Sequence, residues 1–312
     1  MDFQPLIQRI EAYDSIVIFG HIHPDGDCYG SQIGLKEALK IHYPDKKIYA
    51  VGTGYRKFLE MISPMDEITL DVIENSLAIA LDFNSIDRAE DQRILHAKEQ
   101  IMIDHHIEGN SFGTVRWIDD ARVATCEMIA ELIIENHWEL NETGANALYL
   151  GLVTDSGRFQ YQPLTVKTFN YAAFLIEKGA NSNEIYHRLY EINEDSLLLK
   201  GYVYSHYMKT KKGVIYIYFT PDALELFNLE SHHASLMVNF ISNIKGFPIW
   251  VCFAEDESGV IKVEVRSSGP FIQPVCARHG GGGHPLAAGC TVKTREETLE
   301  ILKELDELIV KE

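Results

Sequence analysis

Each of four apolar segments in this chain is followed directly by histidine or aspartate, the side chains that bind hard and borderline divalent cations. In chain order these residues are His21, Asp25 and Asp27, then Asp82, then Asp104, His105 and His106, and finally Asp155. So many polar groups directly after apolar segments are costly to place unless something binds them. Their convergence predicts a metal-dependent hydrolase.

The stretches between these residues alternate between strand-like and helix-like patterns. This alternation predicts an α/β fold with a mostly parallel sheet flanked by helices, and with ligands bound beyond the carboxyl ends of the strands. The candidate ligands stand at those ends. Strands are expected at 15–20, 47–51, 77–81 and 100–103, and helices at 30–43, 56–62, 121–136 and 142–152, with Thr143 as a candidate cap.

The loop that carries Asp25 and Asp27 is shaped by Pro24, which prevents helix continuation, and by Gly26, which permits a turn. Two carboxylates held close together repel each other, and one pKa rises unless a cation lies between them. For this fragment alone, a solvated turn is the simpler interpretation.

His105 and His106 are consecutive, so on an extended chain their side chains point in opposite directions. One imidazole could then bind metal while the other faces a substrate. Asp155 follows an apolar helix that Gly157 would terminate. A carboxylate there opposes the negative end of the helix dipole, and a nearby cation would remove that objection.

The pattern changes beyond residue 205. Strand-like segments at 213–219, 247–254 and 260–265 alternate with helical candidates at 221–227 and 233–244, and an amphipathic helix is expected at 294–310 with Thr294 and Glu297 as a capping box. A chain of 312 residues exceeds the usual size of one compact core. We therefore expect an N-terminal domain at 1–190, a linker at 191–205 and a smaller α/β domain at 206–312.

A second candidate site lies in the C-terminal half, where four consecutive glycines, 280–283, precede His284. Glycines permit close backbone approach and positive φ, which suits a nest of N–H groups around a phosphate. Arg266 offers a guanidinium for bidentate phosphate binding. A flexible linker remains the alternative for the glycines alone.

The composition limits the classes of partner that the protein is expected to bind. The formal net charge of −18 disfavours binding to long duplex nucleic acid, although small phosphorylated ligands remain compatible with a locally positive pocket. No apolar run approaches the roughly 20 residues that span a bilayer, and the N-terminus lacks a signal-peptide pattern. Five scattered cysteines without C-x-x-C spacing favour neither disulfides nor a zinc site, so we expect a reducing cytoplasm.

The motifs together resemble those of a known family. His21-x-x-Pro24-Asp25-x-Asp27, Asp82, Asp104-His105-His106 and Asp155 are similar to the four motifs of the DHH phosphoesterase superfamily, and the stretch ending at His284 resembles the glycine motif of the DHHA1 domain. The resemblance covers nearly the whole chain in the family's order. It is strongest to the nano-RNase/pAp phosphatase group, which cleaves very short oligoribonucleotides and removes the 3′-phosphate of 3′-phosphoadenosine 5′-phosphate (pAp).

The resemblance implies two divalent metal ions, most often manganese, as cofactors. It implies His21, Asp25 and Asp82 around one ion, and Asp27, Asp82, His105 and Asp155 around the other, with Asp82 bridging. It places His106 at the scissile phosphate. It assigns the remaining substrate contacts to Arg158, Arg266, Ser267, Gly281, Gly282, Gly283 and His284.

The expected partners are short single-stranded RNA or DNA oligonucleotides, pAp or dinucleotides, with no membrane and no long duplex. The oligomeric state stays open, a homodimer included. A cyclic-di-AMP or linear-dinucleotide phosphodiesterase is the close alternative. An inorganic pyrophosphatase ranks lower because that group lacks the glycine loop, and a non-catalytic nucleotide sensor has no need of the complete ligand set.

Overall fold

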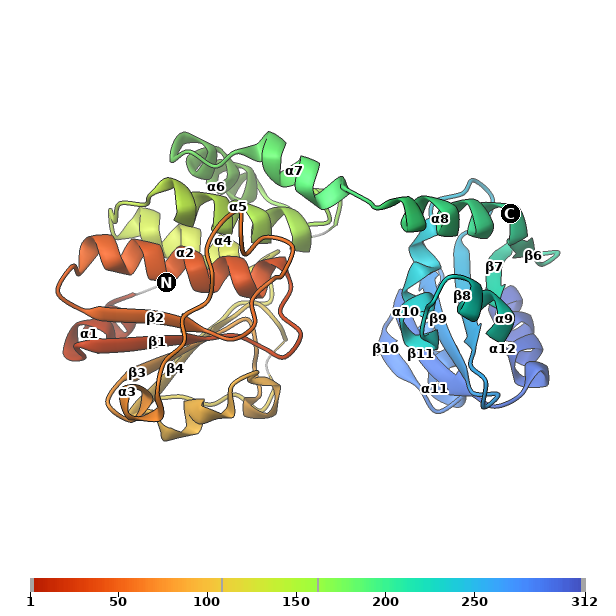
Figure 1. The fold of residues 1–312 in the computed structure, drawn as a ribbon, viewed down its shortest axis with the longest axis horizontal. Coiled ribbons are helices and arrows are strands. Elements are labelled where there is room, and N and C mark those ends of the chain that lie inside the picture. The colour runs from red at the N-terminus through yellow and green to blue at the C-terminus, as the bar shows by residue number, and fades with distance from the viewer. Residues whose placement is uncertain (1–2, 108, 162, 310–312) are drawn as a thin grey trace. The chain divides into compact units, whose positions relative to one another are not determined.

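The computed structural model describes residues 3–107, 109–161 and 163–309, which form two compact units, 1–191 and 192–312. Each unit contains its own sheet and its own hydrophobic core, which confirms the α/β class (Figure 1). Within these described residues we find no helix with the length and apolar character needed to span a bilayer. The five cysteines are buried and free.

The first unit contains a five-stranded, fully parallel sheet in the order β2-β1-β3-β4-β5. Parallel neighbours require crossover connections, and the helices between the strands supply them. The strands are β1 (Ser15–Phe19), β2 (Lys47–Val51), β3 (Leu77–Leu81), β4 (Glu99–Asp104) and β5 (Val115–Ile118). The helices are α1 (Gln4–Ala12), α2 (Gly26–His42), α3 (Leu70–Glu74), α4 (Thr125–Glu135), α5 (Glu142–Asp155), α6 (Val166–Glu177) and α7 (Ser182–Tyr190), with 3₁₀ turns η1 (Ile86–Arg88) and η2 (Gln92–His96).

Alternation along β1 divides the core of this unit between the two faces of the sheet. Ile16 and Ile18 belong to the larger cluster, which the buried faces of α2, α4 and α5 complete, whereas Val17 and Phe19 belong to the smaller cluster on the other face. All four side chains are fully buried. Figure 1 shows α2, α4 and α5 together on one side of the sheet. Burial on both faces fixes the strand register, and with it the residues that emerge at the carboxyl edge.

The second unit contains a six-stranded mixed sheet in the order β10-β11-β9-β8-β7-β6, in which only the β7–β8 pair is parallel. Its strands are β6 (Met208–Lys209), β7 (Val214–Phe219), β8 (Ile249–Glu255), β9 (Ile261–Ser267), β10 (Gly282–His284) and β11 (Ala287–Val292). Its helices are α8 (Glu194–His206), α9 (Pro221–Leu226), α10 (Ser231–Ser235), α11 (Gln273–Arg278) and α12 (Arg295–Glu307), with the 3₁₀ turn η3 (Leu236–Ile241).

Several expectations about elements need correction. Residues 56–62 form turns rather than a helix, and α2 begins at Gly26, inside the first motif, rather than at Gly30. The helix expected at 233–244 is divided into α10 and η3. The cap of α5 is Asn141, whose side chain accepts from Gly144 N, and not Thr143.

The last helix agrees with its sequence pattern. Thr294 and Glu297 form the capping box of α12, as expected, and Val310 lies outside the described residues. The linker expected at 191–205 contains most of α8, and the division between the two compact units falls after Glu191.

Candidate metal centre

The N-terminus of α2 holds the first two carboxylates. Asp25 caps the helix, because its Oδ1 accepts from the backbone N–H groups of Asp27 and Cys28, each at 3.0 Å. Asp27 is fully buried, and its oxygens accept from the N–H groups of Thr125 (2.6 Å) and Cys126 (2.8 Å) at the start of α4. Two helix N-termini therefore stabilise negative charge at this point.

The carboxyl ends of the strands supply the other groups, as the sequence predicted. His21 follows β1, Asp82 follows β3, and His105 and His106 follow β4. Asp82 is almost fully buried and has a φ of 68°, in the left-handed region. Non-glycine residues with strained backbone concentrate at functional sites, where the surrounding structure holds them.

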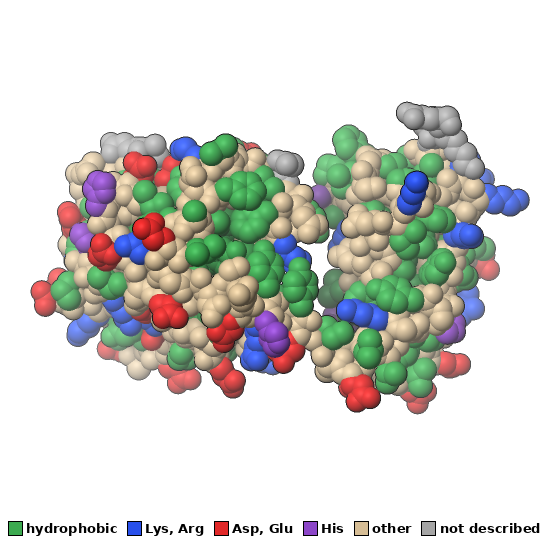
Figure 2. Space-filling model, turned by 90° about the horizontal axis from the view of Figure 1, so that it is seen from above, with side chains coloured by type: hydrophobic (Ala, Val, Ile, Leu, Met, Phe, Trp, Pro, Cys, Tyr) green, Lys and Arg blue, Asp and Glu red, His purple; other side chains and the backbone are tan. Residues whose placement is uncertain are grey.

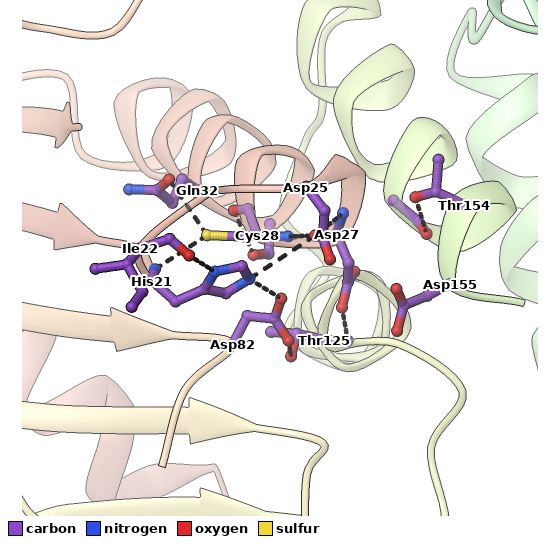
Figure 3. A network of polar contacts seen from close by, with 12 residues as sticks. His21, Ile22, Asp25, Asp27, Cys28, Gln32, Asp82, Thr125, Thr154 and Asp155 are labelled. Carbon is purple, nitrogen blue, oxygen red and sulfur yellow. Dashed lines mark hydrogen bonds and ion pairs between the residues drawn. The ribbon is translucent and has the colours of Figure 1, made fainter. Parts of the chain in front are cut away.

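Asp82 lies between the two imidazoles that face this edge. Its Oδ2 is 3.4 Å from His21 Nε2, and its Oδ1 is 3.4 Å from His105 Nε2. His21 Nε2 also lies 3.9 Å from Asp25 Oδ1, which completes one group of donors. Figure 3 shows the side chains of His21, Asp25 and Asp82 converging. One carboxylate with an oxygen turned toward each imidazole is the arrangement that a bridging ligand needs.

The second group of donors surrounds His105. Its Nε2 lies 3.2 Å from Asp155 Oδ2 and 3.7 Å from Asp27 Oδ2, in addition to the Asp82 contact. Asp155 is the last residue of α5, so its carboxylate is at the negative end of that helix. Asp27, His105 and Asp155 can each turn one donor atom to within 4.8 Å of the others.

Backbone carbonyl groups orient both imidazoles. Nδ1 of His21 contacts the carbonyl oxygen of Ile22 at 2.8 Å, and Nδ1 of His105 contacts that of Arg122 at 3.3 Å. When Nδ1 carries the proton, Nε2 presents a lone pair to a cation. Among the described residues, His105 Nε2 is buried without a hydrogen-bond partner. Imidazole nitrogens and carboxylate oxygens without a thiolate suit a divalent cation such as Mn²⁺, so these residues fit the expected metal.

The protein's own charges leave this edge electrostatically unbalanced. Burial, and then the charge of Asp155, raises the pKa of Asp27 to about 6. Burial and the neighbouring carboxylates raise the pKa of Asp82 well above its usual range. Burial would lower the pKa of His105, but Asp155, Asp27 and Asp82 outweigh it and raise the pKa to about 10. The carboxylates thus favour a positive charge at the position of His105.

The expectation that the side chains of His105 and His106 point in opposite directions is wrong. Both histidines follow the end of β4, their ring centroids are 4.5 Å apart, and both lie beside Asp82, so they do not point in opposite directions. His106 Nδ1 bonds to Asp104 Oδ1 at 2.8 Å, and about half of the His106 side chain is exposed. The buried Asp104 carboxylate therefore orients the more exposed of the two imidazoles.

Two further side chains touch the centre. Thr125 Oγ1 donates to Asp82 Oδ1 at 3.0 Å, a contact that the sequence did not reveal because a threonine at a helix start is usually read only as a cap. Cys28 can join His21 and Asp82 as a donor, but burial raises the pKa of its thiol well above the usual range. It therefore remains a neutral thiol.

The substrate residues expected in the second unit lie on adjacent strands. Arg266 on β9 and His284 on β10 are both paired in register with Ala287 of β11, so they share one row across the sheet. Arg266 Nη1 lies 2.7 Å from Glu264 Oε2, and Ser267 Oγ accepts from Gly269 N at 3.1 Å. Both side chains already have partners within the unit.

The glycine tract has a packing role that the sequence left open. A Cβ at Gly281 would lie 2.0 Å from the carbonyl oxygen of Gly289, and one at Gly283 would lie 2.6 Å from that of Ala287. These glycines therefore let β10 and its approach lie against β11. A Cβ at Gly282 would meet no described atom within 4 Å, so packing does not require glycine there. The phosphate-binding role of the tract stays a prediction.

Comparison with known proteins supports the same assignment along the chain. Residues 15–152 match the model of the DHH family, N-terminal domain, and residues 212–311 match the DHHA1 domain. The chain is 36% identical over 306 residues to the bifunctional oligoribonuclease and PAP phosphatase NrnA of Bacillus subtilis, covering 97% of each chain. It is 32% identical to the protein with the same description from Mycoplasma pneumoniae, covering 97% of this chain and 95% of the other.

A solved structure has the same fold over nearly the whole chain. The crystal structure of an exopolyphosphatase-related protein from Bacteroides fragilis superposes with a TM-score of 0.85 at 27% identity, covering 98% of this chain and 95% of the other. Both domain matches, the full-length relatives and the clustered His and Asp residues at the carboxyl edge of the first sheet lead to one conclusion: the chain belongs to the DHH/DHHA1 phosphoesterases, a family with a metal-dependent active site.

Proposed function

We propose that this protein hydrolyses short oligoribonucleotides to mononucleotides and pAp to AMP and phosphate, with two divalent metal ions bound at the carboxyl edge of the first sheet. The observation that carries the proposal is the position of Asp82, which turns one oxygen toward His21 and the other toward His105. The similarity to the Bacillus subtilis oligoribonuclease and PAP phosphatase over 97% of both chains supports this choice of substrates.

The proposed ligands are His21, Asp25 and Asp82 for one ion, and Asp27, Asp82, His105 and Asp155 for the other. The four carboxylates bring four negative charges, which two divalent ions would neutralise before a phosphate arrives. Such ions, when bound, polarise phosphoryl oxygens and lower the pKa of a shared water to about 7. Manganese is the metal we expect.

The chain's own groups would orient the reacting phosphate. His106, held by Asp104, would offer its Nε2 to a phosphoryl oxygen and offset the charge that develops there. Thr125 would keep the Asp82 carboxylate from rotating, because its hydroxyl donates to one of the two oxygens. In the second unit, we propose that Arg266, Ser267, His284 and residues 281–283 bind the rest of the substrate.

A substrate panel at fixed Mn²⁺ tests the proposal. It contains pAp, oligoribonucleotides of two to five nucleotides, a 24-mer, cyclic-di-AMP and pyrophosphate. We expect the highest kcat/KM on pAp and the shortest oligomers. Turnover confined to cyclic-di-AMP or to linear dinucleotides would favour the phosphodiesterase alternative, turnover confined to pyrophosphate the pyrophosphatase, and metal-dependent binding without turnover a sensor.

Chain length adds a quantitative test. The net charge of −18 penalises long substrates, whose additional phosphates must lie near an acidic surface. Salt screens this repulsion over about 8–10 Å, so the preference for a 3-mer over a 24-mer should decrease as ionic strength rises. A kcat/KM on the 24-mer equal to or above that on the 3-mer at low salt would contradict the proposal. Arg266→Ala should mainly raise KM for short substrates.

A further inference from the structure

The turn that follows α5 holds three consecutive residues in the left-handed region. Gly157, Arg158 and Phe159 have φ values of 55°, 65° and 59°. Gly157 N bonds to Thr154 O and Arg158 N to Val153 O, the pattern that ends a helix with one left-handed glycine. That pattern does not need the two left-handed residues that follow. A left-handed backbone is unfavourable for a residue other than glycine, so the surrounding structure must hold both residues there.

The contacts of Phe159 explain why its backbone is held in the left-handed region, whereas the contacts of Arg158 do not. The Phe159 ring stacks on Phe169 at a centroid distance of 5.4 Å, and its N–H donates to Ser156 Oγ. The Arg158 side chain instead lies over the ring of Tyr190, with Cζ 5.0 Å from the ring centroid. Its Nε is buried and has no hydrogen-bond partner among the described residues. A buried donor without a partner is costly.

Among the described residues, most other arginines of this acidic chain have a carboxylate partner, and Arg158 is the arginine whose buried guanidinium nitrogen has no hydrogen-bond partner. Within the residues that the structure describes, seven lie within 4.0 Å of an Asp or Glu oxygen, and Arg158 is not among them. Those seven are Arg9, Arg93, Arg122, Arg188, Arg266, Arg278 and Arg295. A guanidinium whose face is stacked on a ring keeps its edge donors available for a bidentate acceptor.

Arg158 belongs to the turn that directly follows Asp155, a candidate metal ligand at the end of α5. Arg158 follows Asp155 by three residues, and it shares Tyr55 as a neighbour with Asp25. Burial raises the pKa of Tyr55, the charge of Asp25 raises it further, and the guanidinium of Arg158 lowers it. The phenol is therefore within electrostatic range of both groups. A cation in the turn after a candidate ligand, with no ion pair to a described carboxylate, is suited to an anion that the protein does not supply.

We propose that Arg158, held against Tyr190 by the strained turn, forms a subsite for a second phosphate of the substrate, next to the phosphate that is hydrolysed. The inference rests on the proposed function and deepens it. If Arg158 binds this phosphate, the first unit itself selects substrates with a terminal phosphate, such as pAp or a 5′-phosphorylated dinucleotide. Two oxygens of a tetrahedral phosphate would accept hydrogen bonds from the guanidinium edge, which includes the Nε that has no partner among the described residues.

A pair of substrates that differ by one phosphate tests the subsite. Hydrolysis of pApA and of ApA breaks the same internal bond, and only pApA has the terminal phosphate. Arg158→Ala should lower kcat/KM on pApA by about 30-fold, mainly through KM, and on ApA by less than about threefold. Arg158→Lys keeps the charge without the planar fork and should recover only part of the loss.

Three further variants separate binding from folding and from general charge effects. Arg9→Ala removes an arginine that pairs with Glu99 at the opposite edge of the sheet, and it should leave the pApA/ApA ratio unchanged. Tyr190→Leu should lower the ratio and Tyr190→Phe should preserve it, because the ring supports the guanidinium. Thermal unfolding identifies any variant that fails to fold, and Arg158→Lys then carries the test.

The outcomes distinguish the subsite from the proposed function. Equal losses on pApA and ApA in Arg158→Ala, or no loss on either, would overturn the subsite while the proposed function stands. If wild-type protein with Mn²⁺ hydrolyses no member of the nucleotide panel, the proposed function fails, and the subsite fails with it. A pApA preference that disappears only in the Arg158 and Tyr190→Leu variants is the expected result.

Discussion

The acidic residues with shifted pKa values differ in direction between the metal centre of the first unit and the surface of the second. Asp27 and Asp82 have raised pKa values, with burial as the largest cause. In the second unit, the pKa of Asp256 is lowered by the hydroxyl of Ser258, and that of Glu297 by backbone N–H groups. Arg278 and His279 also hold the pKa of Glu304 below its usual range, although burial acts against them.

The difference separates carboxylates whose charge folding balances from carboxylates whose charge folding leaves unbalanced. In the second unit, helix caps, turns and ion pairs supply donors for each of these three groups. At the edge of the first sheet, folding gathers four carboxylates around two imidazoles, which is a deficit of positive charge. Such a deficit is typical of a site that a ligand completes. The predictions that follow test this contrast.

The largest expected effect follows substitution of the shared carboxylate. Asp82→Asn keeps the shape of the side chain but removes the charge that we assign to both metal sites. We expect turnover on pAp to fall by more than about 10³-fold, equivalent to roughly 4 kcal/mol. Elemental analysis should show loss of bound metal. Asp87→Asn, an exposed aspartate on η1, is the matched control and should leave both quantities unchanged. Fully active protein with one metal ion or none would contradict the two-metal assignment.

The second prediction concerns the different roles of His105, the assigned metal ligand, and His106, the assigned phosphate contact. His106→Ala should lower kcat by about 10²-fold while metal content stays close to that of the wild type, because His105 is the assigned ligand. His105→Ala should instead reduce the metal content. Since both rings lie beside Asp82, the measurement decides between two real geometries. Loss of metal from His106→Ala with retention in His105→Ala would reverse the two roles.

The contrast between predicted and missed features has a physical origin. Parallel strands end at one edge, so polar residues after apolar runs placed His21, Asp82 and His105 together before any coordinates were considered. The direction of the His106 ring was missed because side-chain alternation stops where β4 ends, at Asp104. Hydrogen bonds between distant segments, such as Thr125 to Asp82, have no local signal in a single sequence.

Backbone strain was equally invisible. Arginine does not mark left-handed conformation in the way that glycine does, so the sequence predicted Arg158 as a substrate contact without indicating how it is held. The helix expected at 56–62 failed for a related reason, because short helical spacing is weak evidence where packing selects a turn. Tertiary contacts decide such positions.

The third prediction concerns the metal-free protein and pH. Asp27, with a folded pKa of about 6 against an ordinary 3.8, binds more protons folded than unfolded between those values. His105, at about 10 against 6.5, does the same from pH 6.5 to 10. In both windows stability therefore falls as pH rises. From pH 6.5 to 8.5 the His105 contribution alone should decrease by an amount on the order of 3 kcal/mol.

Thermal unfolding with a chelator and with Mn²⁺ measures this effect. Metal binding requires a deprotonated imidazole, so the rise in Tm produced by metal should be larger at pH 8.5 than at pH 6.5. Asp82→Asn, with a weakened site, should show a small and nearly pH-independent rise. A wild-type metal effect that stays constant over this range would mean that His105 does not titrate with its carboxylate neighbours.

The smallest effect belongs to the carboxylates whose charge is already balanced. Glu304 on α12 contacts Arg278 and His279, and its pKa is lowered, so its contribution to stability is present at neutral pH and is lost as pH falls through the folded pKa. Arg278 is more than half exposed and Glu304 is partly exposed, so solvent screening limits the contribution of this ion pair to roughly 0.5 kcal/mol. Glu304→Gln should therefore lower the Tm of the second unit by about 2–4 °C at pH 7 in calorimetry. The difference should shrink near pH 3.5, and metal should not alter it. Glu300→Gln, on the same helix, is the matched control. The loss of stability in Glu304→Gln should be smaller than the loss that the metal-free first unit shows between pH 6.5 and 8.5. A larger loss in Glu304→Gln would contradict the contrast between balanced and unbalanced carboxylates.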